Sequence, residues 1–160
     1  MIMLSHPSQS ADAPASNRLG ALASLGTSEL GALRLAAEMR QRVRATRDVV
    51  LAGQRMLGPM IVIEGWLGRV QLFSDGRRQI LSFLVPGDVI QDFSTFQSIA
   101  PSTITALSDA VLCPAPAAED IGLGEAYAAS AALDEIYLLR QIARLGRMSA
   151  YECIQDWLRS

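Results

Sequence analysis

The chain has 160 residues, half of them hydrophobic, and a formal net charge of −2. This length fits one domain, with or without a helical extension. A free-standing nucleic-acid-binding protein normally carries a basic excess against phosphates, so the charge argues against that class. The two cysteines, Cys113 and Cys153, are too few for a disulfide scaffold or an iron–sulfur cluster. With no signal peptide pattern and no apolar run of roughly 20 residues, we expect a cytoplasmic protein.

The N-terminal part of the sequence changes character near residue 18. Residues 1–17 are rich in Ser, Ala and Pro and have no periodicity, which predicts a flexible tail. The following stretch, up to Arg44, has apolar residues at helical spacing and predicts one or two short helices. Thr27 or Ser28 is the expected helix cap. The apolar positions are Leu22, Leu25, Leu30, Leu33, Leu35, Ala36 and Met39.

Residues 48–114 have a strand pattern. Short runs of β-branched and large apolar residues alternate with Gly, Pro and Asp, which predicts an antiparallel sandwich or barrel. The clearest hairpin turns at Asp75-Gly76, because glycine supplies the positive φ that a tight turn needs. On its return strand, Leu81, Phe83 and Val85 are expected to share the buried face. The predicted strands are Val49–Leu51, Met60–Ile63, Leu67–Phe73, Gln79–Val85, Thr103–Leu107 and Ala110–Cys113.

After Pro116 the pattern is helical again. The alternating four- and three-residue spacing of apolar and small residues is typical of a seam between two helices, although such a stripe can also pack against its own domain. Residues 149–152 resemble a capping box that opens a further helix. Arg140 and Arg144 are expected to be solvated or paired with Asp134 and Glu135. The seam positions are Ala132, Ile136, Leu139, Ala143 and Gly146.

Three motifs stand in order within residues 61–90: Glu64-Gly65-Trp66, the run from Asp75 to Ile80, and Pro86-Gly87-Asp88. In this order and spacing they resemble the Crp/Fnr family of bacterial transcription regulators, and residues 139–158 resemble the end of that family's dimerisation helix, its hinge and the next helix. The resemblance implies an α+β fold. It consists of an antiparallel, jelly-roll-like β-roll of the cyclic-nucleotide-binding type, with N-terminal helices and a long C-terminal dimerisation helix.

The resemblance also implies a division of the chain. Residues 18–126 would be the sensor domain, and residues 127–160 the dimerisation helix, the hinge and the start of a linker. The family's helix-turn-helix domain would follow where this sequence ends, so DNA would be bound only through that absent domain. The chain would then be an effector-sensing module that forms a homodimer. The dimerisation residues would be Leu133, Ile136, Tyr137, Leu139, Arg140 and Ala143, and the hinge Leu145, Gly146 and Arg147.

In family members that bind cyclic AMP, a phosphate-binding segment follows the Pro-Gly-Asp turn. Here residues 79–139 contain no Arg or Lys, and Pro101 removes an N–H donor. A buried cyclic phosphate needs a cation and several donors, so we expect no cyclic AMP or cyclic GMP binding. The effector would be an unknown small molecule, or there would be none. The corresponding pocket residues are Val89, Gln91, Asp92, Phe93, Ser102 and Thr103.

Two other classes of function have different requirements. An enzyme is not expected, because the single histidine, His6, lies in the predicted tail and cannot serve a metal site or a catalytic triad. No glycine-rich phosphate loop is present, and no cofactor or metal is predicted. The alternative that stays open is a stand-alone interaction module, which would pair with itself or with a full-length relative without binding DNA.

Overall fold

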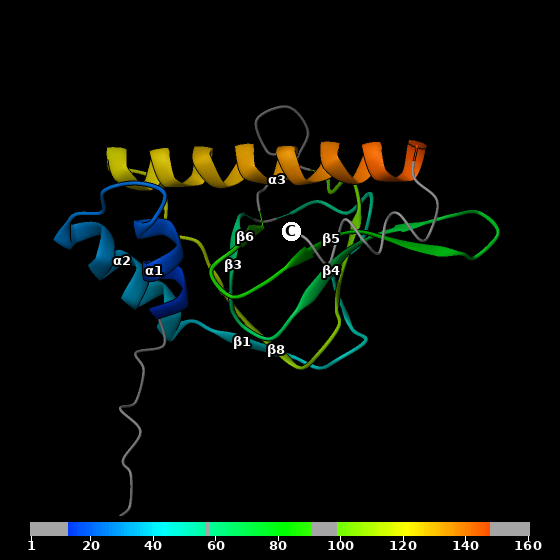
Figure 1. Cartoon of the computed structure of the whole chain (residues 1–160). Helices are drawn as coiled ribbons and strands as arrows, with labels where there is room; N and C mark the ends of the chain where they lie inside the picture. The colour runs from blue at the N-terminus through cyan, green and yellow to red at the C-terminus, as the bar shows by residue number, and fades with distance from the viewer. Residues whose placement is uncertain (1–12, 57, 91–98, 148–160) are drawn as a thin grey trace, which may run out of the picture.

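The computed structural model describes residues 13–147, except residue 57 and residues 91–98. It has the predicted α+β architecture, with a β-roll between N-terminal helices and one long C-terminal helix (Figure 1). The helices are α1 (Ala13–Gly20), α2 (Thr27–Glu38) and α3 (Ile121–Arg147). The strands are β1 (Gln41–Val43), β2 (Asp48–Val50), β3 (Met60–Glu64), β4 (Leu67–Leu72), β5 (Arg78–Leu84), β6 (Val89–Ile90), β7 (Thr103–Ala106) and β8 (Ala110–Pro114).

The strands form two antiparallel sheets of four strands each. One has the order β1-β8-β3-β6 and the other the order β2-β7-β4-β5. Between them lies a buried apolar cluster that includes Val62 and Leu112 from the first sheet and Leu67 and Ile104 from the second. This cluster is the interior of the roll, and its burial is the main stabilising contribution to the paired sheets.

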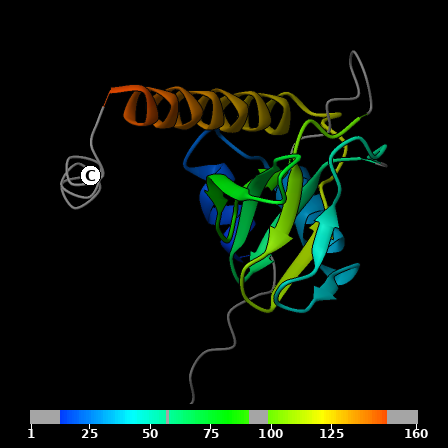
Figure 2. The same ribbon diagram turned by 90° about the vertical axis from the view of Figure 1, so that its right-hand side faces the viewer.

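A second core lies on the other face of the β1-β8-β3-β6 sheet. Ile61 and Ile63 of β3 pack there with Leu19 of α1, Leu33 of α2 and Leu123 of α3. Because this sheet is covered on both faces, three consecutive residues of β3, 61–63, are all buried. Beyond this core, α3 runs across the roll, and its end extends past the strands (Figure 2).

The helix boundaries differ from the prediction in three places. Residues 13–17, expected in the tail, belong to α1, because Ala15 and Leu19 are one helical turn apart and both fully buried. The N-cap of α2 is Gly26 rather than Thr27 or Ser28. The last helix begins at Ile121, ahead of the predicted boundary at residue 127.

The β4–β5 hairpin turns where predicted, with Gly76 at φ +84°. The predicted buried face of β5 is wrong, however: Leu84 is 1% exposed and Phe83 is 55% exposed. The reason is a bulge, since Arg69 pairs with Ser82 but the next residue, Val70, pairs with residue 80. The extra residue shifts the alternation of β5 by one position. The short strands β1 and β6 were not predicted.

Candidate functional site

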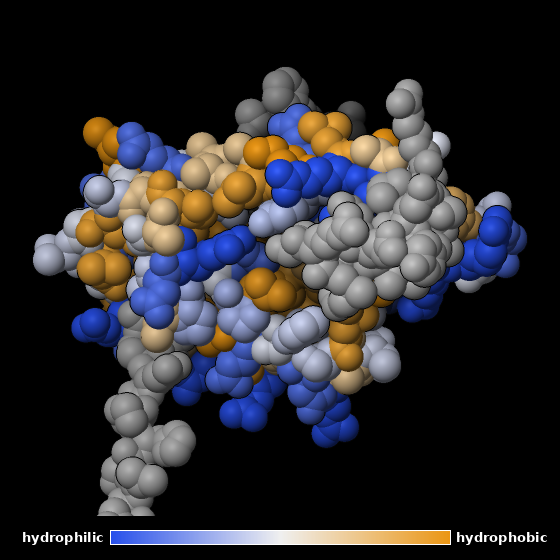
Figure 3. Space-filling view, in the orientation of Figure 1, coloured by the Kyte–Doolittle hydropathy of each residue, from blue (hydrophilic) through white to orange (hydrophobic). Residues whose placement is uncertain are grey.

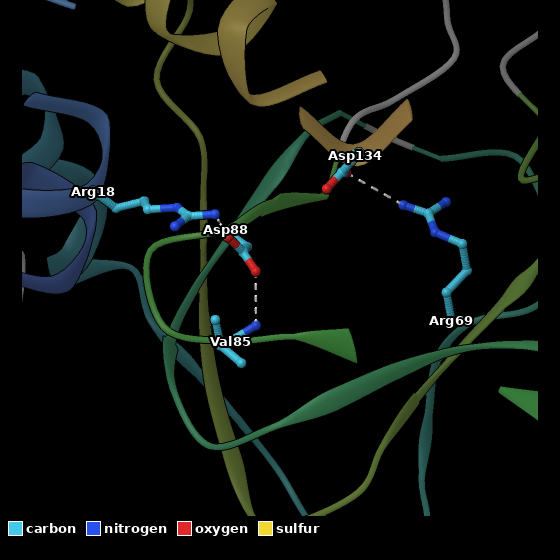
Figure 4. Close-up of polar contacts among 5 residues, drawn as sticks. All are labelled: Arg18, Arg69, Val85, Asp88 and Asp134. Atoms are coloured by element: carbon cyan, nitrogen blue, oxygen red, sulfur yellow. Dashed lines mark hydrogen bonds and ion pairs between the residues drawn. The ribbon is translucent and has the colours of Figure 1, made fainter. Parts of the chain in front are cut away.

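The Pro86-Gly87-Asp88 turn connects the roll to α1. One carboxylate oxygen of Asp88 lies 3.0 Å from the Arg18 guanidinium, and the other accepts a hydrogen bond of 2.9 Å from the Val85 N–H (Figure 4). Gly87 has φ +92°, and a Cβ there would lie 2.5 Å from the Cβ of Arg18. The motif therefore holds α1 against the roll through a glycine that allows close approach and a carboxylate that bridges two elements.

A second arginine–aspartate pair joins the roll to α3. Arg69 extends from β4 toward Asp134 of α3, and the two side chains face each other beneath the helix (Figure 4). The distance from an Arg69 terminal nitrogen to the nearer Asp134 oxygen is 3.8 Å. Arg69 is only 7% exposed, because it points to the same face of the strand as the core residue Leu67, two positions earlier. A charge thus occupies a position that strand alternation assigns to the interior.

Burial works against both charges of this pair. It lowers the pKa of Arg69, an effect that the nearby Asp134 carboxylate opposes. Burial also raises the pKa of Asp134. The positive charge of Arg69 lowers this pKa, the negative charge of Asp88 raises it further, and Arg18 lowers it. The two shifts agree that the attraction does not fully compensate for the lost hydration, as is common for buried ion pairs. The pair is therefore a weak contributor to stability.

The predicted pocket residues lie in different surroundings. Val89 is fully buried in the core that faces the helices. The Thr103 hydroxyl accepts a hydrogen bond of 3.1 Å from the Ala52 N–H, at the edge of β7. Ser102 is 4% exposed, and its hydroxyl has no hydrogen-bond partner among the residues that the structure describes. The other three, Gln91, Asp92 and Phe93, lie outside the described residues.

The sequence reasoning missed Arg18 and Arg69. Residues 79–139 indeed contain no Arg or Lys, but the fold brings cations to Asp88 and Asp134 from α1 and β4. The available signal was the alternation in β4, where Arg69 follows Leu67 by two positions and so points inward. Asp134, named as a possible partner of Arg140 and Arg144, lies within ion-pair distance of Arg69.

The outer face of α3 is apolar. Ile136, Leu139 and Ile142 are 44%, 58% and 66% exposed, and they lie on one face at spacings of three residues. Apolar side chains gather along this helix at the top of Figure 3. Among the other predicted dimerisation residues, Tyr137, Arg140 and Ala143 are exposed, and Leu133 is half-buried.

The predicted hinge falls in the last turn of α3. The helix continues without a break through Gly146 to Arg147. Nothing within 4 Å would meet a Cβ at Gly146, so close packing does not require a glycine there. The predicted capping box at residues 149–152 lies outside the described residues.

A cavity of about 620 Å³ opens elsewhere on the roll, and residues of β1, β2, β3 and β8 contribute to its walls. The predicted pocket residues that the structure describes, Val89, Ser102 and Thr103, do not line it, and neither do Arg69 and Asp134. Within the described ranges, no three His, Cys, Asp or Glu side chains are grouped so as to hold a metal ion. No described helix combines the length and hydropathy that crossing a membrane requires.

The β-roll matches a known protein family. The family model described as the cyclic nucleotide-binding domain matches residues 40–120, which include all eight strands. The chain belongs to this family. The match ends at residue 120, just before α3 begins. The outer face of α3 is therefore not part of the matched region. No match was found among curated proteins by the corresponding search.

Solved structures with the same fold include Crp/Fnr regulators, which confirms the predicted resemblance. Over 68% of this chain, a CRP-family transcriptional regulator from Thermus thermophilus has a TM-score of 0.61 at 23% identity. A CRP/FNR-family regulator from the same organism has a TM-score of 0.63 at 19% identity over 69% of the chain. The chain spans 56% and 58% of the length of those two proteins.

A third similar structure covers more of the chain. The c-di-GMP-responsive global regulator CLP of Xanthomonas campestris has a TM-score of 0.65 at 15% identity, over 92% of this chain and 70% of its own. At these identities the likeness establishes the fold. The two Thermus thermophilus proteins are described as transcriptional regulators, and CLP is described as a global regulator.

Proposed function

We propose that this chain is the effector-sensing and dimerisation module of a Crp/Fnr-type transcription regulator. The observation that carries the proposal is the two-sided character of α3. One face is tied to the roll through Asp134 and Arg69, whereas the opposite face exposes Ile136, Leu139 and Ile142. A helix with this arrangement is suited to pair with the same helix of a second copy while it responds to the roll.

Pairing along α3 would bury the exposed stripe. Apolar side chains gain roughly 25 cal/mol for each Å² removed from water, so three large side chains on each helix supply a substantial driving force. The two-fold arrangement of two such helices also suits regulators that read two-fold DNA sites. We therefore infer a homodimer in the cytoplasm. Contact with DNA would be made by a domain that is not part of this sequence, in keeping with the net charge of −2.

We further propose that cyclic AMP and cyclic GMP are not the effectors. The cations that reach the underside of α3, Arg18 and Arg69, each face an aspartate already. A cyclic phosphate also needs several N–H donors besides a cation, and residues 79–139 supply no Arg or Lys for it. Isothermal titration calorimetry with cyclic AMP is expected to give no binding at micromolar concentration. A micromolar dissociation constant would contradict this part of the proposal.

Sedimentation velocity tests the dimerisation part. Ile136→Glu places a charge in the middle of the exposed stripe and is expected to convert a dimer of the wild-type chain into a monomer. The matched control is Leu35→Glu, because Leu35 of α2 is also a highly exposed apolar residue, at 65%. The control should remain dimeric. An Ile136→Glu protein that sediments as the wild type does would overturn the assignment of α3.

A further inference from the structure

Arg69 is a buried arginine with an unpaired N–H donor at Nε. A guanidinium has five N–H donors in a fixed plane. The Nε of Arg69 has no hydrogen-bond partner among the described residues. Its contact with Asp134, at 3.8 Å, is longer than a hydrogen bond. Buried polar groups are normally satisfied, so this side chain has donors available for a group that is not part of the described chain.

Ser102 provides a second unpaired donor on the same side of the sheet. Arg69 pairs with Ile104 across the β4–β7 ladder, so the two side chains lie on the same face of the sheet. Ser102 directly precedes β7 and is two positions before Ile104, so continuation of the strand alternation assigns it to that face. Its hydroxyl is fully buried and has no partner among the described residues. An unpaired polar group of β4 and one at the residue that precedes β7 are therefore both buried.

Asp134 occupies the position opposite Arg69 without being fixed there. Its side chain is 29% exposed, so the carboxylate can turn into water without leaving the helix. Burial already disfavours its charged form, as described above. An anion that approaches Arg69 within hydrogen-bond distance would therefore compete with the 3.8 Å contact of Asp134.

We propose that Arg69 is the recognition group for a small effector with one carboxylate, which replaces the Asp134 carboxylate and also bonds to Ser102. The proposal rests on the sensing role proposed above. A carboxylate matches the guanidinium because two parallel N–H···O bonds form between planar groups. It would occupy a place that a carboxylate already fills, so the exchange needs no large cavity.

The surrounding charges limit the effector to a single negative charge at this point. Asp88 and Asp134 both act on the same small region, as the effect of Asp88 on Asp134 shows. A phosphate dianion would add a second charge that Arg69 alone cannot compensate. The effector's remaining part is expected to be neutral, because the neighbours of Arg69 in the ladders are Ile104 and Ser82.

Binding at Arg69 would change how α3 is held. Asp134 of α3 forms an ion pair with Arg69 of the roll, so its displacement removes a tie between the two parts. By reciprocity, a position of α3 that withdraws Asp134 from Arg69 would raise the affinity for the effector. The site is thereby linked to the helix that carries the proposed dimer surface.

NMR of the arginine Nε–H groups in the full chain provides a direct test, with sodium acetate as the probe and sodium chloride at equal ionic strength as the reference. The Arg69 signal is assigned by its loss in Arg69→Gln. Acetate, but not chloride, is expected to shift this signal in the wild type. In Asp134→Asn, which removes the competing carboxylate, the acetate dissociation constant should fall at least about fivefold, the lower end of ordinary coupling between sites.

The control is Arg77→Gln, since Arg77 is also paired with an aspartate but is exposed in the hairpin loop. It should bind acetate as the wild type does, with an unchanged Arg69 signal. If Arg69→Gln fails to fold, Arg69→Lys keeps the charge without the fork and should bind acetate more weakly in a thermal-shift assay. An Arg69 signal unmoved by acetate in both the wild type and Asp134→Asn would overturn the proposal. Sedimentation of the same samples reports dimerisation separately, so the two proposals fail independently.

Discussion

The carboxylate of Glu29 in α2 accepts a 2.8 Å hydrogen bond from the backbone N–H of Leu123, 94 residues further along the chain in the first turn of α3. Its second oxygen accepts a 2.6 Å hydrogen bond from the N–H of Gly26, at the start of α2. Glu29 is 4% exposed. One buried carboxylate thus satisfies unpaired donors at the beginnings of two helices and fixes the start of α3 against the N-terminal helices.

Replacing this carboxylate should destabilise the fold. Glu29→Ala leaves the buried N–H of Leu123 and the part-buried N–H of Gly26 without their charged acceptor, and the free energy of unfolding is expected to fall by about 2 kcal/mol. Urea denaturation followed by circular dichroism measures the change. The control is Ser28→Ala, which removes only the exposed hydrogen bond from Ser28 to Asp120 and should cost less than about 1 kcal/mol. Equal losses for the two variants would contradict the role given to Glu29.

Gly76 and Gly87 both need a positive φ, but only Gly87 is closely packed, so substitutions at the two positions distinguish backbone strain from steric clash. Gly76 and Gly87 have φ of +84° and +92°, but a Cβ at Gly76 would meet nothing within 4 Å, whereas one at Gly87 would lie 2.6 Å from the Pro14 carbonyl oxygen. Gly76→Ala is expected to cost about 1–2 kcal/mol, the left-handed penalty alone. Gly87→Ala should cost clearly more and loosen α1. Similar midpoints of thermal unfolding would show that α1 does not need this contact.

The pH dependence of stability tests the electrostatics of Asp134. Its folded-state pKa is raised above the ordinary value of 3.8 by burial, an effect that Asp88 enhances and Arg69 and Arg18 oppose. The stabilising contribution of Asp134 to the free energy of unfolding is therefore fully present below pH 3.8, and it is lost as the pH rises through the folded-state pKa.

Asp134→Asn, which stays neutral, provides the reference for this measurement. The free energy of unfolding of the wild type, minus that of the variant, is expected to decrease as the pH rises above 3.8. Chemical denaturation at several pH values gives the difference directly. A difference that increases with pH would mean that the attraction of Arg69 outweighs the burial of Asp134.

Cys113 should be unreactive in the folded protein. It is 2% exposed, and burial raises the pKa of its thiol to about 11, so only about one molecule in a thousand is a thiolate at pH 8. In a Cys153→Ser background, labelling by a disulfide reagent is expected to be slow in buffer and immediate in denaturant. Rapid stoichiometric labelling of the native protein would contradict the burial of this residue beneath α1 and α2.

Most of the architecture could be predicted from the sequence, because apolar periodicity and turn residues specify it locally. The hairpin at Asp75-Gly76 needs only a glycine with positive φ, and the helical part of α3 needs only spacing. The face of β5 could not be predicted, since a single extra residue opposite Arg69 and Val70 shifts the alternation. A bulge of this kind depends on the partner strand as much as on β5 itself.

The candidate site was less accessible to sequence reasoning. Residues 79–139 supply no cation of their own, whereas Arg18 and Arg69 come from α1 and β4 through tertiary contacts. The pairing of Arg69 with Asp134 joins residues 65 positions apart in the sequence. Ser102 was named as a pocket residue from the family pattern, but its unpaired hydroxyl is visible only in the fold.

Cross-linking between two copies of α3 tests the central claim most directly. In a Cys153→Ser background, Leu139→Cys places a thiol on the exposed stripe, at a position that is 58% exposed in the single chain. Mild oxidation is expected to join two chains through residue 139, while Leu35→Cys on α2 should give little covalent dimer. Efficient cross-linking at residue 139 alone would support pairing along α3. A chain that stays monomeric, or that cross-links equally at residue 35, would contradict a dimerising sensor module.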